Sequence, residues 1–414
     1  MHGVGGSLVM ASAGGGLVIM PVLLAVSVAH LINDTLQSVL LSIYPMVREP
    51  LGLDYVQIGL ITLVFQLTAS VLQPFVGLYT DRRPLPFSLP SGMVVTGAGI
   101  LLLAFAENFW TLLLAATLIG VGSSVFHPEA SRVARLASGG RYGFAQSLFQ
   151  VGGNSGQALA PLLVALFVYP LGQAHAAWFA LVAGLGVFLL LRVSRWYRDH
   201  LEALPRGTRN QPLPSPVDRP KVIAALAILL ALTFSKNVYM AAFSSYYTFF
   251  LIERFGVSVQ AAQLHLFVFL GAVAAGTMLG GPLGDRIGRK PVLWLSIAGV
   301  LPFSLALPFL SLPLTVLAAI VVGVLMASAF PAIVVYAQEL MPGRVGMVAG
   351  LFFGFAFGMG GIGAVLVGWL ADVQGLTFAF RLCALLPAIG LLVTFLPDLD
   401  ALTRRGSRQI VATG

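Results

Sequence analysis

Long apolar runs, each about 20 residues in length, alternate with short polar segments along almost the whole chain. An α-helix of about 20 apolar residues is long enough to cross the hydrocarbon core of a bilayer. The pattern therefore predicts an all-α integral membrane protein with twelve spanning helices. Their approximate ranges are 18–44, 55–79, 86–106, 109–133, 142–168, 173–194, 221–250, 259–280, 291–310, 313–337, 345–370 and 376–396.

The longest internal polar stretch divides the predicted helices into two groups of six. This stretch, 195–220, is rich in proline and arginine, so it is expected to be a cytoplasmic linker rather than part of a core. The complete division is a disordered leader at 1–17, a six-helix half at 18–194, the linker at 195–220, a second six-helix half at 221–397 and a cytoplasmic tail at 398–414.

A short charged motif recurs in the two groups. Gly281 to Lys290 reads GPLGDRIGRK, and Gly77 to Pro84 reads GLYTDRRP about 204 residues earlier. A second set recurs at an offset of 203 residues. It comprises Gly120, Pro128, Gly140, Arg141 and Gly143, repeated as Gly323, Pro331, Gly343, Arg344 and Gly346. The chain is therefore predicted to be a duplication of one half of about 200 residues.

Composition and charge agree with a membrane protein. Hydrophobic residues make up 58% of the chain and charged residues 9%, against about 25% charged in soluble domains. With both termini placed inside, all but four of the 23 Lys and Arg fall on the cytoplasmic side. The basic balance thus indicates topology and contact with anionic lipid, not a nucleic-acid partner. Cys383 is the one cysteine, which excludes a disulfide framework or a cysteine metal cluster.

The charged motif resembles the loop signature between the second and third helix of each half in the major facilitator superfamily. Gly281 to Lys290 matches that signature almost completely, whereas the first copy has Arg83 and Pro84 where the family has a variable residue and glycine. The segments HLINDTLQSVLLSIYP, QIGLITLVFQL, GSSVFHPEASRVARLASGGR and QSLFQVGGN resemble the fosmidomycin-resistance branch of proton-coupled drug exporters. The resemblance implies two pseudo-symmetric six-helix halves around a central substrate path.

Polar residues on one face of the first helix are candidates for proton coupling. His30, Asn33, Asp34 and Gln37 follow the i, i+3, i+4, i+7 spacing of a helix face, and an ionisable group within a span is costly unless it has a function. Drug exporters of the family often carry an arginine in the fourth helix, where this chain has Ala116. The proton-coupling candidates are His30, Asp34, His127 and Glu129. The alternative is that the stripe serves only hydrogen bonding between helices.

Amides, one lysine and two tyrosines are candidates for substrate binding. The resemblance places helices 1 and 7 along the central cavity, and the second and fifth predicted helices each carry amides spaced along one face. The set is Asn33, Gln37, Gln66, Gln150, Asn154, Lys236, Asn237, Tyr239 and Tyr247. Lys236 could pair with Asp34 across the substrate path, or each could be satisfied separately by water and amides. The tyrosines could equally be packing residues.

Three glycines in the fifth predicted helix match part of the antiporter signature of the family. Gly143, Gly152 and Gly156 have the required spacing, but Gln157 stands at the proline position of that signature. The same glycines could instead form a close packing seam between helices.

The two copies of the charged motif are predicted to form a gate. The residues are Gly77, Asp81, Arg82, Arg132, Gly281, Asp285, Arg286, Gly288 and Arg289. Asp81 and Asp285 are expected to accept hydrogen bonds from the first turns of helices that begin near Gly343 and Gly140, where the helix dipole favours an anion. Arg82 is expected to reach Glu129 or a neighbouring acidic group at the end of the fourth predicted helix. The alternative is that both carboxylates only cap tight loops.

The sequence contains no phosphate-binding P-loop and no nucleophile elbow, so an ion gradient is the expected energy source, and the resemblance implies that the ion is the proton. No enzyme activity, cofactor or metal is expected. The resemblance implies a monomeric exporter of small toxic compounds, including fosmidomycin, in the bacterial inner membrane with both termini cytoplasmic. Its partners would be a small-molecule substrate, protons and membrane lipid. A proton symporter for uptake of a metabolite is the alternative, and a membrane receptor or integral membrane enzyme is a third class.

Overall fold

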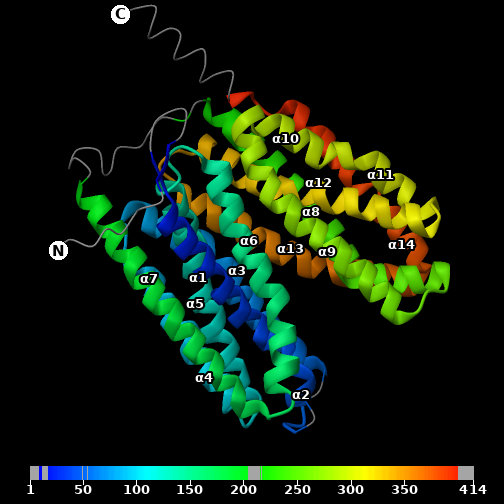
Figure 1. The fold of residues 1–414 in the computed structure, drawn as a ribbon, viewed down its shortest axis with the longest axis horizontal. Helices are drawn as coiled ribbons and strands as arrows, with labels where there is room; N and C mark the ends of the chain where they lie inside the picture. Colours follow the sequence, from blue (N-terminus) through cyan, green and yellow to red (C-terminus); the bar gives the residue numbers. More distant parts are fainter. Residues whose placement is uncertain are drawn as a thin grey trace, which may run out of the picture. The chain divides into compact units, whose positions relative to one another are not determined.

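The computed structural model describes residues 9–11, 17–48, 50–53, 55–203, 215 and 217–399, and these are mostly helical (Figure 1). The chain divides into two units. Unit 1 comprises residues 1–212 together with 343–354, and unit 2 comprises 213–342 and 355–414. The division follows the two predicted halves, except that the first turns of the eleventh predicted helix belong to unit 1.

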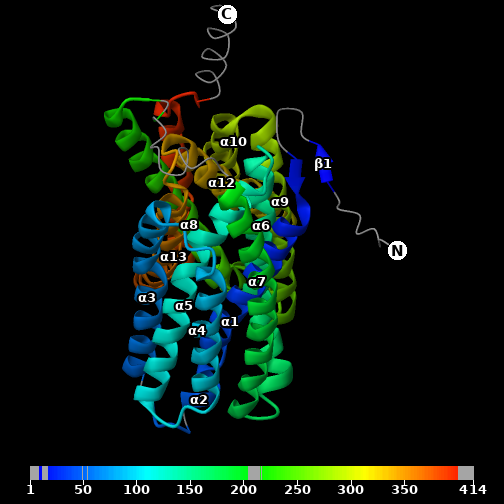
Figure 2. The same ribbon diagram turned by 90° about the vertical axis from the view of Figure 1, so that its left-hand side faces the viewer.

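The described part of unit 1 contains six long helices. They are α1 (Met20–Ser42), α3 (Tyr55–Arg82), α4 (Ser88–Ala104), α5 (Phe109–Leu136), α6 (Tyr142–Leu163) and α7 (Trp178–Ala203). Shorter elements are α2 (Tyr44–Arg48), the π-helical turn η1 (Val164–Val168) that continues α6, and the 3₁₀ turn η2 (Gln173–Ala177) that precedes α7. Helix α1 packs against α6, and α5 packs against both α3 and α4, with the helices running side by side (Figure 2).

Helix α5 lies between α3 and α4, and glycines on α5 let its backbone approach both helices closely. A side chain at Gly122 would collide with Thr96 of α4, and one at Gly120 would collide with Thr68 of α3. The helix begins with a capping box, in which Asn108 accepts from the Thr111 N–H and the Thr111 hydroxyl accepts from the Asn108 N–H. These features fix α5, which carries two of the proton-coupling candidates, against the rest of unit 1.

In the described part of unit 2 several helices are interrupted. Its elements are α8 (Arg219–Phe255), α9 (Val259–Ile287), α10 (Arg289–Ser296), α11 (Leu301–Ala306), α12 (Leu312–Leu340), α13 (Val345–Gln374, from residue 355 onward) and α14 (Leu376–Cys383), with 3₁₀ segments η3 (Ala298–Val300), η4 (Leu307–Phe309) and η5 (Leu386–Phe395). Helix α9 packs against α12. The ninth predicted span is broken around Pro302 and Pro308, because proline lacks the N–H that an α-helix interior requires.

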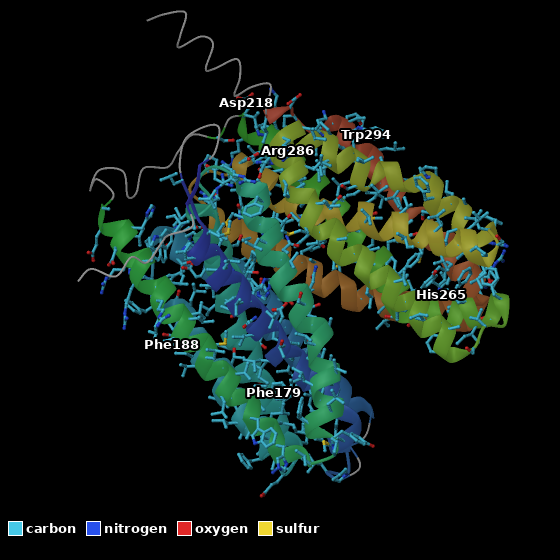
Figure 3. The ribbon with its side chains drawn as sticks, viewed as in Figure 1. Phe179, Phe188, Asp218, His265, Arg286 and Trp294 are labelled. Carbon is cyan, nitrogen blue, oxygen red and sulfur yellow. The ribbon has the colours of Figure 1, made fainter. Side chains whose placement is uncertain are left out.

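Ten stretches of the described chain are long and apolar enough to cross a membrane, and the shorter α4 is a further apolar helix. Together with the α6–η1 segment they account for the twelve predicted spans. Helix α7 shows the sidedness of such a helix: Phe188 is 50% exposed, whereas Phe179 is 6% exposed and faces the interior (Figure 3). The exposed apolar face is suited to contact with lipid.

Two segments differ from the sequence prediction. Within the predicted disordered leader, strand β1 (Val9–Ala11) pairs antiparallel with β2 (Leu17–Ile19), and the other residues before Leu17 lie outside the described residues. Helix α7 continues to Ala203, so the start of the predicted linker is helical. Residues 204–214 and the predicted tail from 400 onward also lie outside the described residues.

Candidate functional site

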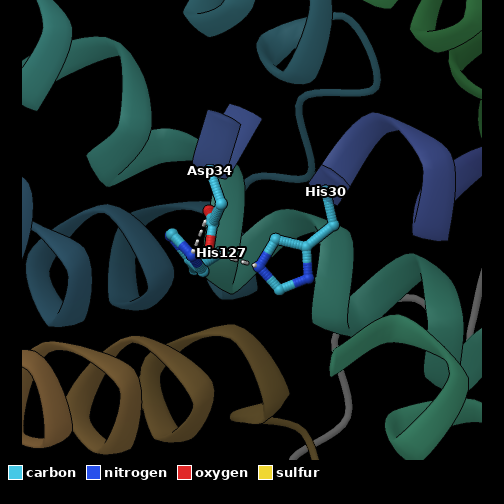
Figure 4. Close-up of side chains that lie close together, drawn as sticks. All are labelled: His30, Asp34 and His127. Atoms are coloured by element: carbon cyan, nitrogen blue, oxygen red, sulfur yellow. Dashed lines mark ion pairs between the residues drawn. The ribbon is translucent and has the colours of Figure 1, made fainter. Parts of the chain in front are cut away.

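Three of the four proton-coupling candidates meet inside unit 1 (Figure 4). The Asp34 carboxylate on α1 lies between His30, one turn earlier on the same helix, and His127 of α5. His30 Nε2 lies 3.5 Å from Asp34 Oδ2, and His127 Nε2 lies 3.4 Å from Asp34 Oδ1. All three residues are at most 2% exposed. An ionisable group so deeply buried requires compensating partners.

Three side-chain amides supply such partners to Asp34. Asn33 Nδ2 and Gln37 Nε2 donate to Oδ1 at 3.1 and 3.0 Å, and Gln157 Nε2 of α6 donates to Oδ2 at 2.9 Å. Both carboxylate oxygens are therefore hydrogen-bonded. Asn33 and Gln37 were substrate-binding candidates, whereas Gln157 was not among the predicted site residues. Its spacing from Gln146, Gln150 and Asn154 along one face of α6 is the signal that could have identified it.

The two histidine rings are held by their surroundings. The His30 Nδ1 atom lies 2.7 Å from the Phe149 carbonyl oxygen, and the His30 ring stacks on the Phe149 ring with centroids 4.0 Å apart. The His127 ring meets the His30 ring edge-on at 5.1 Å and the Phe353 ring at 5.1 Å. Phe353 belongs to the part of α13 that lies in unit 1. The apolar rings surround the cluster and restrict its access to water.

Two imidazoles and a carboxylate are also a donor set that transition metals accept. The candidate donor atoms of His30, Asp34 and His127 all lie within 4.8 Å of one another. Oδ1 of Asp34 already accepts two amide hydrogen bonds, whereas Oδ2 accepts one from the described residues. The remaining lone pair of Oδ2 is therefore the position at which the carboxylate can take a further proton or cation.

Glu129, the fourth proton-coupling candidate, lies in a second buried group. Its Oε1 atom pairs with Arg132 Nη1 at 2.5 Å, one turn further along α5. Arg132 Nη2 pairs with Asp81 Oδ1 at the end of α3 and donates to the Thr80 hydroxyl at 3.1 Å. Arg132 is 7% exposed and Glu129 is 0% exposed. The guanidinium thus bridges two carboxylates, a geometry that lysine could not reproduce.

Asp81 also caps the start of α13. The Gly346 N–H donates to Oδ1 at 2.9 Å, and the Met347 N–H donates to Oδ2 at 2.8 Å. A side chain at Gly346 would collide with Arg132, and one at Gly77 would collide with the Gly346 backbone. The expected contact between Asp81 and a helix that begins near Gly343 is therefore present. The expectation for Arg82 was wrong, because Arg82 is exposed and Arg132 contacts Glu129.

The second copy of the motif forms a comparable charge group in unit 2. Arg289 pairs with Asp285 at 2.9 Å through Nη1 and with Glu339 of α12 at 3.2 Å through Nη2. Gly288, with φ of 95°, separates α9 from α10, a backbone conformation that favours glycine. Gly281 is buried, and Arg286 is exposed at the end of α9 (Figure 3). The expected contact of Asp285 with a helix that begins near Gly140 stays a prediction.

The remaining substrate candidates of unit 1 lie on α3 and α6. Gln150 is 6% exposed, and its amide nitrogen has no hydrogen-bond partner among the described residues. Gln66 is half-buried and Asn154 is exposed. A buried amide with an unused donor is suited to a polar ligand.

Of the substrate-binding candidates in unit 2, Lys236 and Asn237 are half-buried, whereas the two tyrosines are buried. Lys236 is half-buried with its Nζ 4.8 Å from the centroid of the Phe330 ring, and Asn237 donates to the Thr233 carbonyl at 2.8 Å. Tyr239 and Tyr247 are 2% and 0% exposed. They pack on opposite sides of Phe243 along α8, at centroid distances of 5.1 and 5.2 Å, as in the alternative packing interpretation. The Tyr239 hydroxyl accepts a hydrogen bond from Ser304 at 2.9 Å, whereas the Tyr247 hydroxyl has no hydrogen-bond partner among the described residues. Lys236 and Tyr247 are therefore better suited than Tyr239 to bind a ligand.

Two of the three glycines of the partial antiporter signature, Gly152 and Gly156, form a packing seam. A side chain at Gly152 would collide with the Ser27 carbonyl of α1, and one at Gly156 with the Leu31 carbonyl. The seam holds α6 close enough to α1 for Gln157 to reach Asp34.

Comparison with known proteins agrees with this architecture. The family model of the Major Facilitator Superfamily matches residues 26–262 and 229–410. The chain is 55% identical over 374 residues to the Fosmidomycin resistance protein of Escherichia coli strain K12, covering 90% of this chain and 92% of that protein. It is 43% identical over 385 residues to an uncharacterized MFS-type transporter, YfnC, of Bacillus subtilis strain 168, covering 92% of this chain and 94% of that protein.

Solved structures show the same fold. The chain is similar to the Major Facilitator Superfamily transporter FucP, with a TM-score of 0.71 and 18% sequence identity, covering 92% of this chain and 99% of that chain. Similarity to the proton:xylose symporter XylE has a TM-score of 0.70 with 14% identity and covers 93% and 99% of the two chains. The chain therefore belongs to the Major Facilitator Superfamily and, by its extensive identity to a fosmidomycin resistance protein, to the fosmidomycin-resistance branch of that family.

Proposed function

We propose that this protein is a proton-coupled antiporter that exports small toxic compounds, including the phosphonate antibiotic fosmidomycin, by alternating access. The identity of 55% to a fosmidomycin resistance protein over 90% of the chain supports the substrate class. The observation that carries the coupling is the Asp34 carboxylate, buried within a span between two histidines. Ionisable groups in such positions commonly serve proton pathways.

Proton and substrate would occupy neighbouring groups of unit 1. The Asp34 cluster takes up a proton, and Asn33 and Gln37 are shared between the carboxylate and a polar substrate. When the substrate binds these amides, they no longer donate to the Asp34 carboxylate. Losing these hydrogen bonds destabilises the charged carboxylate more than the protonated carboxyl group. Binding of one ligand therefore changes the affinity for the other, which is the linkage that an antiporter requires.

The charge group around Arg132 would act as the gate. It joins α3, α5 and the first turn of α13 through Asp81. Charge-assisted hydrogen bonds of this kind contribute about 1.5 to 3 kcal/mol each. Several such bonds, made in one state and broken in the other, are sufficient to bias an equilibrium between two conformations.

The distribution of basic residues supports a location in the bacterial inner membrane, with both termini on the cytoplasmic side. Three arginines in the two copies of the charged motif are exposed. Arg82 and Arg83 lie at the C-terminal end of α3, and Arg286 lies at the C-terminal end of α9. Basic residues near helix ends stay preferentially on the cytoplasmic side and attract anionic lipid. The protein would work there as a monomer, with membrane lipid as its surroundings.

Transport by purified protein in proteoliposomes tests the proposal. With a pH-sensitive dye inside the vesicles, fosmidomycin movement in one direction should be coupled to proton movement in the other. Asp34→Asn should abolish the proton signal while fosmidomycin binding is retained, and Asp218→Asn, at an exposed position before α8, should behave as the parent does. Proton and fosmidomycin movement in the same direction would establish the alternative, a symporter.

A further inference from the structure

The hydrogen bond from His30 to the backbone fixes which nitrogen of His30 faces Asp34. A carbonyl oxygen can only accept a hydrogen bond, so the contact of 2.7 Å with the Phe149 carbonyl places a proton on Nδ1 of His30. The stacking on Phe149 prevents the ring from turning over without losing this contact. Nε2 is therefore the atom directed at Asp34 Oδ2, 3.5 Å away.

The pair of His30 Nε2 and Asp34 Oδ2 has a place for an additional proton. If His30 is neutral, Nε2 presents a lone pair to a carboxylate oxygen, and two acceptors then face each other in a buried site. A proton on Nε2 or on Oδ2 converts the pair into a charge-assisted or neutral hydrogen bond. The other groups that face Asp34 are the Asn33 and Gln37 amides of α1, the Gln157 amide of α6 and His127 of α5.

Gly153 of α6 lies directly over this pair. A methyl group at Gly153 would come within 2.5 Å of His30 Nε2 and within 2.9 Å of Asp34 Oδ2, closer than nonbonded atoms approach. The collisions at Gly152 and Gly156 are with the backbone of α1, so those glycines serve helix packing. Gly153 differs because its contacts are with the side chains of the proton site.

We propose that the coupled proton is held between Nε2 of His30 and Oδ2 of Asp34, in a space that Gly153 keeps free. Gly153 is then a positioning residue. His127 approaches the other carboxylate oxygen, Oδ1, which already accepts hydrogen bonds from the Asn33 and Gln37 amides, whereas Oδ2 accepts only the Gln157 amide among the described residues. This inference rests on the proposed function, since it names the atoms at which that coupling takes place. It also explains why α6 contributes both Gly153 and, one turn later, the Gln157 amide that orients Asp34.

The first test is proton release on fosmidomycin binding, measured with a pH dye and purified protein in weak buffer over a range of pH. Gly153→Ala should lose proton release, or shift its pH midpoint by about one unit or more, while fosmidomycin binding is retained. Gly184→Ala is the matched control, because a methyl group at Gly184 of α7 meets no atom within 4 Å. An unchanged pH profile in folded Gly153→Ala protein would overturn the inference.

The second test does not require the Gly153 variant to fold, nor the drug to bind. Infrared difference spectra between low and high pH should contain a protonated-carboxyl band that Asp34→Asn removes. We expect His30→Gln to shift that band and His127→Gln to leave it in place. A band that responds only to His127→Gln would assign the proton to the other oxygen and overturn the inference. Absence of proton release in the parent protein, with the His30-dependent band present, would count against the proposed antiport alone.

Discussion

Asp81 and Gly346 are separated by 265 residues in the chain, yet the Gly346 N–H donates to the Asp81 carboxylate at 2.9 Å. The carboxylate accepts a second bond from Met347 and pairs with Arg132. An anion at the first turn of a helix interacts favourably with the helix dipole and with N–H groups that have no partner within the helix. This contact ties the start of α13 to the end of α3.

Asp81→Asn should therefore weaken the closed gate. The amide oxygen of asparagine can still accept a hydrogen bond but carries no charge, so we expect a loss of about 1.5 to 3 kcal/mol from the closed state and slower transport. Since Cys383 is buried, single reporter cysteines near Gly343 can be used to measure accessibility from the cytoplasmic side. Accessibility should rise in Asp81→Asn and stay at the parent level in Asp218→Asn. If transport fell with no change in accessibility, a folding role would remain for Asp81.

Arg132→Lys should be more damaging than its conserved charge suggests. The guanidinium reaches Glu129 with one nitrogen and Asp81 with the other, and an ammonium group cannot hold both in this geometry. Leaving the buried Glu129 without its partner should cost about 3 to 5 kcal/mol. We expect a clear fall in the thermal unfolding temperature in detergent. The double variant Arg132→Lys with Glu129→Gln should recover part of it, because the unpaired charge is then removed.

Lys236→Gln should affect anionic substrates selectively. Lys236 has no carboxylate partner within the described part of unit 2, and its contact with the Phe330 ring leaves the ammonium charge available to a ligand. We expect a reduction in fosmidomycin affinity of about tenfold or more, as for loss of one charge-assisted bond. Affinity for a neutral compound exported by the same protein should be unchanged. Equal losses for both compounds would indicate a structural role for the lysine.

Gly122→Ala should destabilise unit 1 without changing the proton site. The added methyl group would meet the Gly92 carbonyl and Thr96 of α4, so α4 and α5 must move apart at a cost of about 1 to 3 kcal/mol. Gly184→Ala, where the same group meets open space, should be neutral or slightly stabilising because alanine favours the helix. Thermal unfolding of both variants in detergent measures the difference. Equal unfolding temperatures would show that the α4–α5 contact is more adaptable than its geometry suggests.

The order of residues alone predicts the helical spans, the repeat of the charged motif and the residue types available for chemistry. This was possible because hydrophobic length, proline-rich linkers and charged loops are local properties, read directly from the order of residues. The polar stripe on one face of α1 likewise indicated His30 and Asp34, since helical spacing alone places them one turn apart.

Which of these residues meet depends on the packing of the helices. The structure joins His127 to Asp34 and Glu129 to the Arg132 group, although His127 and Glu129 are only two positions apart on α5. Positions two apart on a helix point in different directions, and their partners come from other helices whose packing the residue order does not specify. The structure also shows that Arg132, and not Arg82, is the partner of Glu129. Which arginine is buried depends on the orientation of α3 against α5, and the position of Arg82 in the charged motif does not reveal that orientation.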